Sequence, residues 1–89
     1  MRKKIHFHIL GKKGSDAYAL RGRLDEALRG FPNVQPTIIE VDDDTEIMTF
    51  GVSLLPALAI DGTARIIGRV PEVAEIAFFL SEICSHDGR

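Results

Sequence analysis

The sequence contains a single cysteine, Cys84, among 89 residues. One thiol forms no intramolecular disulfide and supplies no multi-cysteine metal site, so a protein that cycles a disulfide of its own is excluded. Cys84 falls on the apolar stripe of the last predicted helix, where a cysteine usually packs as a small hydrophobic side chain. The alternative, a reactive thiol or an intermolecular disulfide at Cys84, requires an exposure that this stripe argues against.

The sequence also lacks long apolar runs and a strong net charge. No run of 18 or more apolar residues is present, which argues against a membrane-spanning helix. The formal net charge of -2 gives no overall field that would attract nucleic acid or an anionic membrane. The first ten residues, MRKKIHFHIL, have only a short apolar stretch after the basic ones, which is unlike a secretory signal. We therefore expect a cytoplasmic protein with neither nucleic acid nor membrane as a partner.

What is present is the composition of a globular domain. Hydrophobic residues make up 45% of the chain and charged residues 27%. The length suits one domain, which we expect over residues 1–84. Residues 85–89 carry no apolar side chain and are expected to form a disordered tail.

Hydrophobic periodicity predicts seven elements in the order βαβαββα. The four expected strands are 5–10, 34–41, 58–60 and 63–67. Asp61-Gly62, between the last two strands, is a strong hairpin signal. Pro36 suggests that the second strand lies at an edge of the sheet, or that Pro36 stands at the start of this strand.

The three expected helices have recognisable starts. Ser15 is the expected N-cap of the first helix, and Pro71 suits the first turn of the last one. The short second helix is expected at about residues 45–50, and Asp43 and Glu46 before and within it have the spacing of a capping box. A cap is therefore favoured over a metal site for the acidic run 42–44.

Three segments carry a resemblance to a known family: LGKKGSDAYAL, EIMTFGVSLLPALAIDG and IIGRVP. Together they resemble the small thioredoxin-like proteins of the redox-active-disulfide type, over about residues 3–83. The resemblance implies a thioredoxin fold, an α/β architecture with a four-stranded mixed sheet and helices on both faces. The first and third helices are expected on one face and the short second helix on the other.

In these relatives a Cys-x-x-Cys motif opens the first helix, and its positions fall here on Gly14, Ser15, Asp16 and Ala17. Thiol–disulfide exchange needs a thiolate and a second, resolving thiol. Glycine and alanine supply neither. Ser15 is no substitute nucleophile, because no histidine lies near it in the sequence to act as its base. The resemblance therefore implies a vestigial active site.

The relatives also carry a cis-proline beside the motif, and its position falls on Pro56. In such a fold the backbone of the preceding residue, here Leu55, pairs with an extended peptide. Relatives often have threonine before this proline. Leu55 departs from that pattern and makes the groove more apolar, while backbone pairing is unaffected.

Three further groups of residues invite a functional interpretation. Lys12 and Lys13, before the first helix, are candidate anion contacts, although a solvated turn is favoured and the full spacing of a nucleotide-binding loop is missing. His6 and His8 share one face of a strand, but two ligands are too few for a metal site, so we expect partly buried, hydrogen-bonded histidines. Phe78 points away from the buried stripe of the last helix and Phe79 lies at its edge, which suggests an interface, including a homodimer.

The sequence thus predicts a redox-inactive thioredoxin-like protein without a cofactor. Its favoured role is a non-enzymatic module that binds a peptide or protein in the former active-site groove. One alternative is an oxidoreductase component that relies on a partner's cysteines or on Cys84. The other is a structural or oligomeric role through the last helix.

Overall fold

The computed structural model describes residues 2–86 and contains four strands and three helices. The strands are β1 (Lys3–Leu10), β2 (Val34–Val41), β3 (Ala57–Ile60) and β4 (Thr63–Ile67). The helices are α1 (Ser15–Leu28), α2 (Asp44–Met48) and α3 (Val73–His86). Within the described part of the chain, no helix is long and apolar enough to cross a membrane.

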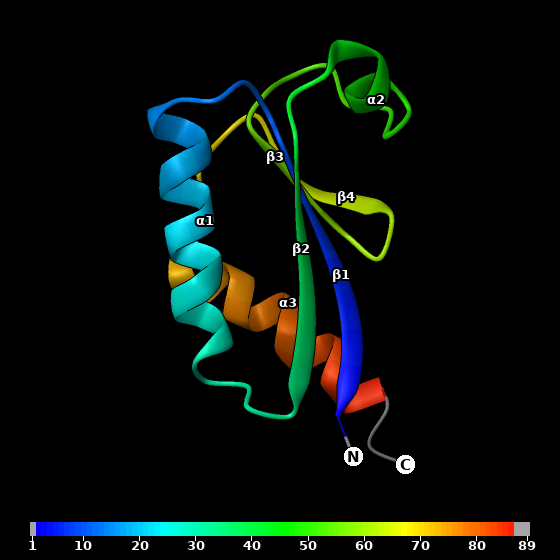
Figure 1. The fold of residues 1–89 in the computed structure, drawn as a ribbon. Helices are drawn as coiled ribbons and strands as arrows, with labels where there is room; N and C mark the ends of the chain where they lie inside the picture. Colours follow the sequence, from blue (N-terminus) through cyan, green and yellow to red (C-terminus); the bar gives the residue numbers. More distant parts are fainter. Residues whose placement is uncertain (1, 87–89) are drawn as a thin grey trace.

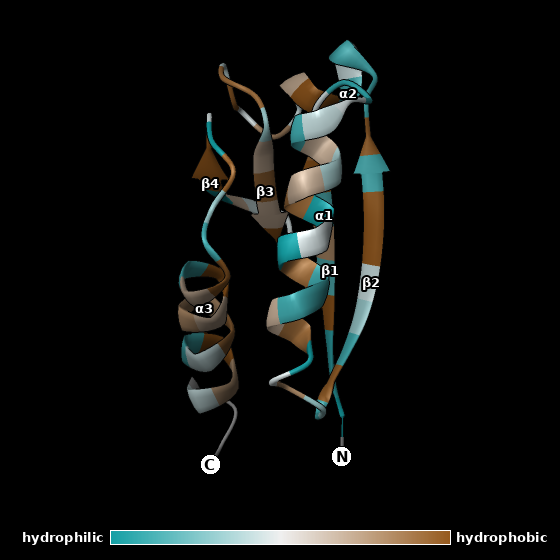
Figure 2. Cartoon of the chain, turned by 90° about the vertical axis from the view of Figure 1, so that its left-hand side faces the viewer, coloured by the Kyte–Doolittle hydropathy of each residue, from teal (hydrophilic) through white to brown (hydrophobic). Residues whose placement is uncertain are grey.

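The strands form one mixed sheet in the order β2-β1-β3-β4. β1 pairs in parallel with β2 and antiparallel with β3, and β3 pairs antiparallel with β4. Figures 1 and 2 show α1 and α3 on one face of the sheet, whereas α2 lies on the other face near one end. The predicted βαβαββα order and four-stranded mixed sheet, consistent with a thioredoxin fold, are confirmed. β2 is an outer strand, as Pro36 indicates.

The main core lies between the sheet and the helices α1 and α3. Alternate residues of β1 point into it, and Leu20 and Leu24 of α1 meet Ile76 and Leu80 of α3 there. A smaller cluster on the opposite face joins α2 to the sheet, and its buried members are Leu10, Val41, Ile47 and Ala57. Because β1, β2 and β3 each contribute residues to both clusters, the sheet itself joins the two layers.

Two local predictions, one for a helix cap and one for a hairpin turn, are confirmed. The Asp43 carboxylate accepts a hydrogen bond from the Glu46 backbone N–H at 3.0 Å, and so caps α2. Asp61 and Gly62 have φ of 49° and 86°, the left-handed conformations that a two-residue hairpin turn requires.

Other helix-end predictions were wrong. Gly14 is the N-cap of α1 and Ser15 is already helical; within the described part of the chain, no side chain caps this helix. Pro71 lies two positions before α3 rather than in its first turn, and it is buried. Helix α3 includes Ser85 and His86, which were expected in the tail; the remaining tail residues, 87–89, lie outside the described residues.

The connection from β4 to α3 is closed by an ion pair between Arg69 and Glu75. Arg69 Nη1 donates to Glu75 Oε1 at 2.7 Å, and Arg69 Nη2 contacts Glu75 Oε2. The hydrogen bond from Arg69 holds the pKa of the Glu75 carboxyl below its ordinary value. The stabilisation that this pair provides is therefore present above the ordinary carboxyl pKa and is lost as the pH falls through the lowered one.

We expect the substitution Arg69→Gln to raise the pKa of Glu75 back towards its ordinary value. An NMR titration of the side-chain carbonyl carbon measures this shift directly. Arg65→Gln is the matched control, because Arg65 makes no ion pair with Glu75 in the described structure. An equal shift in both variants would show that overall charge, rather than the Arg69 contact, sets the Glu75 pKa.

Candidate functional site

The turn between β1 and α1 packs against the segment before β3. A Cβ placed on Gly11 would lie 3.7 Å from both Cα and Cβ of Pro56, an ordinary van der Waals distance, so the two segments lie side by side. The φ of Gly11 is +155°, which side chains rarely adopt. The peptide bond between Leu55 and Pro56 is cis. The fold thus joins two segments that are far apart in the sequence.

A hollow lies at this junction, and Ala17 from the first turn of α1 faces Leu55 and Pro56 across it. Its lining residues are Gly11, Lys12, Asp16, Ala17, Leu55 and Pro56. Of the four positions that the resemblance assigns to the former motif, Asp16 and Ala17 therefore line the same hollow as the proline. Gly14 lines an adjoining hollow with Lys13, Ala17, Tyr18 and Glu40.

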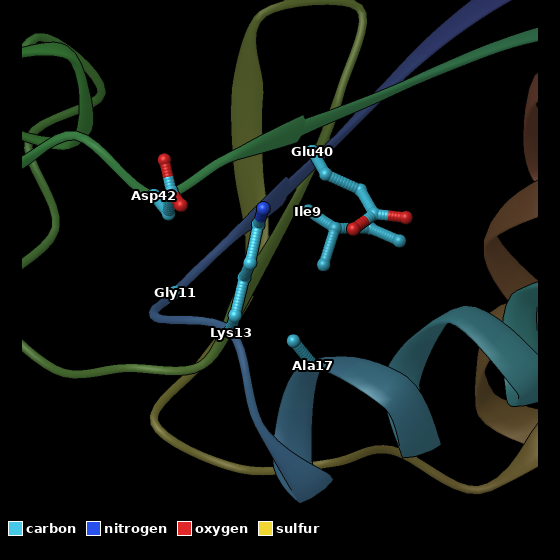
Figure 3. A pocket seen from close by; sticks show the side chains of 6 residues that line it. All are labelled: Ile9, Gly11, Lys13, Ala17, Glu40 and Asp42. Carbon is cyan, nitrogen blue, oxygen red and sulfur yellow. The ribbon is translucent and has the colours of Figure 1, made fainter.

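A third hollow continues towards the outer strand β2. Figure 3 shows its lining: Ile9, Gly11, Lys13, Ala17, Glu40 and Asp42. The Lys13 side chain extends across the ends of the strands, and Ala17 points in from α1. Ala17 lines all three hollows, and we call them together the Ala17 groove.

Unpaired backbone groups lie on two sides of the Ala17 groove. The first N–H groups of a helix have no intrahelical acceptors, and at α1 no side chain replaces them. On the opposite side, the Leu55 N–H and C=O make no hydrogen bond within residues 2–86. The Leu55 side chain is 39% exposed. Donors and an acceptor are thus open to a bound chain.

Lys12 and Lys13 are placed differently, although they are neighbours. Lys12 Nζ lies 2.8 Å from the Asp44 carboxylate and donates to the Asp42 carbonyl at 3.0 Å. Its hydrogen bond with Asp44 raises the pKa of Lys12. Lys13 makes no ion pair among the described residues. The charge of Lys12 is therefore engaged by α2, and Lys13 is the freer of the two candidate anion contacts.

His6 and His8 were expected to be partly buried and hydrogen-bonded, and the structure agrees with this only in part. The His6 side chain is 56% exposed, with Nδ1 3.9 Å from an Asp61 carboxylate oxygen, so it is not partly buried as expected. His8 is half-buried with its ring centroid 4.9 Å from that of Phe50, but its buried Nδ1 has no hydrogen-bond partner among residues 2–86. The sheet below α2 carries no helix on this face, which explains why His6 is exposed (Figure 1). Within residues 2–86, no three potential ligand side chains gather into a metal site.

The remaining candidate residues lie on α3. Cys84 is half-buried and packs against the main core. The C-terminal part of α3 lies near the end of the molecule opposite the start of α1 (Figure 1). Phe78 is 59% exposed, whereas Phe79 packs against the core.

One wall of the Ala17 groove was not predicted from the sequence; it is formed by Tyr18, Glu40 and Asp42. A signal for it existed. In the parallel register Leu10 lies beside Val41, so the residues around Val41 must lie next to the turn that follows Leu10. Charged residues at the carboxyl end of the second strand were therefore candidates for the site from the start.

The comparisons place the chain in a family. The family model described as Thioredoxin domain matches residues 5–81, most of the chain. None of the curated proteins matches it. The chain belongs to this thioredoxin domain family.

Proposed function

We propose that this member of the thioredoxin domain family is a non-catalytic module that binds an extended peptide or protein segment in the Ala17 groove. One observation carries the proposal. The free backbone N–H and C=O of Leu55 lie across a hollow from Ala17 and the uncapped start of α1. An extended segment satisfies such groups by pairing as a further strand does.

The proposed lack of catalysis follows from the absence of two thiols in the groove. In this proposal Gly14 and Ala17 stand where dithiol relatives carry cysteines, so neither the nucleophile nor the resolving thiol is present. The only thiol of the chain, Cys84, packs on α3 away from the groove. That placement supports binding without exchange, and it gives no support to an oxidoreductase that works through Cys84.

The groove has two chemically different sides. Near the proline it is apolar, with Leu55, Pro56 and the methyl group of Ala17. Towards β2 it is charged, with Lys13 unpaired and Glu40 held by Arg21 Nη1 at 3.1 Å. A bound segment would place an apolar side chain against Leu55 and polar side chains towards Lys13 and Glu40.

The test is a selection of binders from a phage-displayed library of random peptides, followed by affinity measurement. Gly14→Phe fills the groove, and it is sterically allowed because nothing lies within 4 Å of a Cβ at this position and the backbone is extended. We expect Gly14→Phe to weaken binding of a selected peptide at least about tenfold, the loss of a well-packed contact. Gly22→Phe is the control, since Gly22 is exposed on the same helix with open space around it.

Amide shifts observed by NMR should move at residues 15–17 and at Leu55 when the peptide is added. The absence of any selected binder, or equal affinity for Gly14→Phe and Gly22→Phe, would contradict the proposal. Turnover of insulin reduction by the unmodified chain would contradict its non-catalytic part.

A further inference from the structure

A second surface with the character of an interface lies between α3 and β4. A hollow here is lined by Arg65, Phe78, Phe79, Glu82 and Ile83, which we call the Phe78 surface. The Phe78 ring is 59% exposed and meets the Phe79 ring edge-on, with centroids 5.9 Å apart. Because Phe79 packs against the core, this contact supports Phe78 in a defined position.

The helix around Phe78 permits a close approach. Three exposed residues on this side of the helix, at i−4, i+3 and i+7 from Phe78, are small: Ala74, Ser81 and Ser85. The exposed residue at i+4 is Glu82. Small side chains leave the aromatic ring as the most prominent feature of this face. A partner that covers it must therefore offer an apolar contact for one large ring.

Two opposite charges flank the ring. Arg65 on β4 and Glu82 on α3 line the same hollow, and neither makes an ion pair or a side-chain hydrogen bond among the described residues. A twofold axis places the same patch of each copy against the other, so residue i of one meets residue j of its partner and the reverse. The surface is therefore complementary to itself in charge. β4 is also an outer strand, so no further strand of the described chain covers this margin.

We propose that a second copy of this chain covers the Phe78 surface in a twofold homodimer. In this dimer the two Phe78 rings pack together, and Arg65 of each copy faces Glu82 of the other. A partner of one predominant charge would leave either Arg65 or Glu82 opposite a like charge, whereas a second copy pairs both. The dimer uses α3 and β4 and leaves the Ala17 groove open, so it is independent of the peptide-binding proposal.

Sedimentation equilibrium over a concentration series tests this proposal. We expect a monomer–dimer equilibrium for the unmodified chain at concentrations up to about 1 mM, at which even a dimer of millimolar Kd is detected. Phe78→Glu should raise the dimer Kd at least about tenfold, because a hot-spot ring is replaced by a charge. Met48→Glu is the control: Met48 is also highly exposed but lies on α2, on the other face of the sheet. Circular dichroism checks that both variants are folded.

Charge reversal tests the arrangement itself. Arg65→Glu and Glu82→Arg should each weaken the dimer, and the double variant should restore it, because the pair is re-formed across the interface. A monomer at all concentrations, or equal effects of Phe78→Glu and Met48→Glu, would overturn the homodimer. Failure of the double variant to recover would overturn the twofold pairing. Peptide affinity of Phe78→Glu, measured in parallel, should equal that of the unmodified chain.

Discussion

With cysteines at positions 14 and 17 in a Cys84→Ala background, we expect the protein to form an intramolecular disulfide and to catalyse insulin reduction. The unmodified chain, with Cys84 alone, should show no such activity. This change from none to measurable turnover is the largest functional effect expected for this protein. It tests whether Gly14 and Ala17 occupy the positions at which the dithiol relatives carry their cysteines.

The structure supplies the physical reason. Gly14 is the N-cap and has extended backbone, so a side chain there is free of the helical path, and a Cβ would meet nothing within 4 Å. Ala17 lies in the first turn, where unpaired backbone N–H groups stabilise a thiolate. A cysteine at position 17 would also face Leu55 and Pro56 across the hollow.

The matched control is a pair of cysteines at positions 15 and 18 in the same background. It has the same sequence spacing, but both residues are helical and exposed, and the Tyr18 side chain is 85% exposed. Thiol titration and mass spectrometry after mild oxidation measure the disulfide in each protein. A folded 14/17 variant that forms no more disulfide than the 15/18 variant would show that the motif has been placed at the wrong positions.

Phe7→Ala should destabilise the protein by about 3–5 kcal/mol, the usual cost of truncating a buried phenylalanine. Phe7 is 0% exposed and belongs to the main core, on the inner strand β1. Domains of ordinary stability have only about 5–15 kcal/mol in total, so this one substitution should remove a large part of it. The chain has no tryptophan, so urea unfolding is followed by far-ultraviolet circular dichroism.

Ile39→Ala provides the comparison within the same sheet. Ile39 lies on β2 and is 40% exposed, on the face that bears no helix apart from α2. We expect Ile39→Ala to lower the free energy of unfolding by about 1 kcal/mol or less. Strand preferences measured in a host protein span about this range. Equal losses for the two variants would mean that the main core is not where the structure places it.

The sequence contained enough to predict the fold because its signals are local and agree with one another. Alternating apolar residues define β1, and Asp61-Gly62 defines the hairpin between β3 and β4. The predicted N-cap of α1 was wrong by one residue. Serine is preferred over glycine at N-cap positions, but the chain is still extended at Gly14 and already helical at Ser15.

The candidate site was less predictable, because it depends on which segments meet. Parallel pairing of β1 and β2 indicates that their carboxyl ends meet, but the register that brings Glu40 and Asp42 to the Ala17 groove is fixed only in the assembled sheet. The environment of His6 and His8 depends on how far α2 covers its face of the sheet. The five-residue helix α2 covers only one end of this face of the sheet, and the length of α2 cannot be predicted from the residues of β1.

The contact between Lys12 and Asp44 has a practical consequence for binding studies. It links the turn that forms one wall of the Ala17 groove to the start of α2, and both side chains are largely exposed, at 62% and 79%. Exposed pairs are screened by salt, with a Debye length of about 8 Å at physiological ionic strength. We therefore expect this contact to weaken as ionic strength rises, so measurements of the proposed peptide binding should be compared at one stated salt concentration.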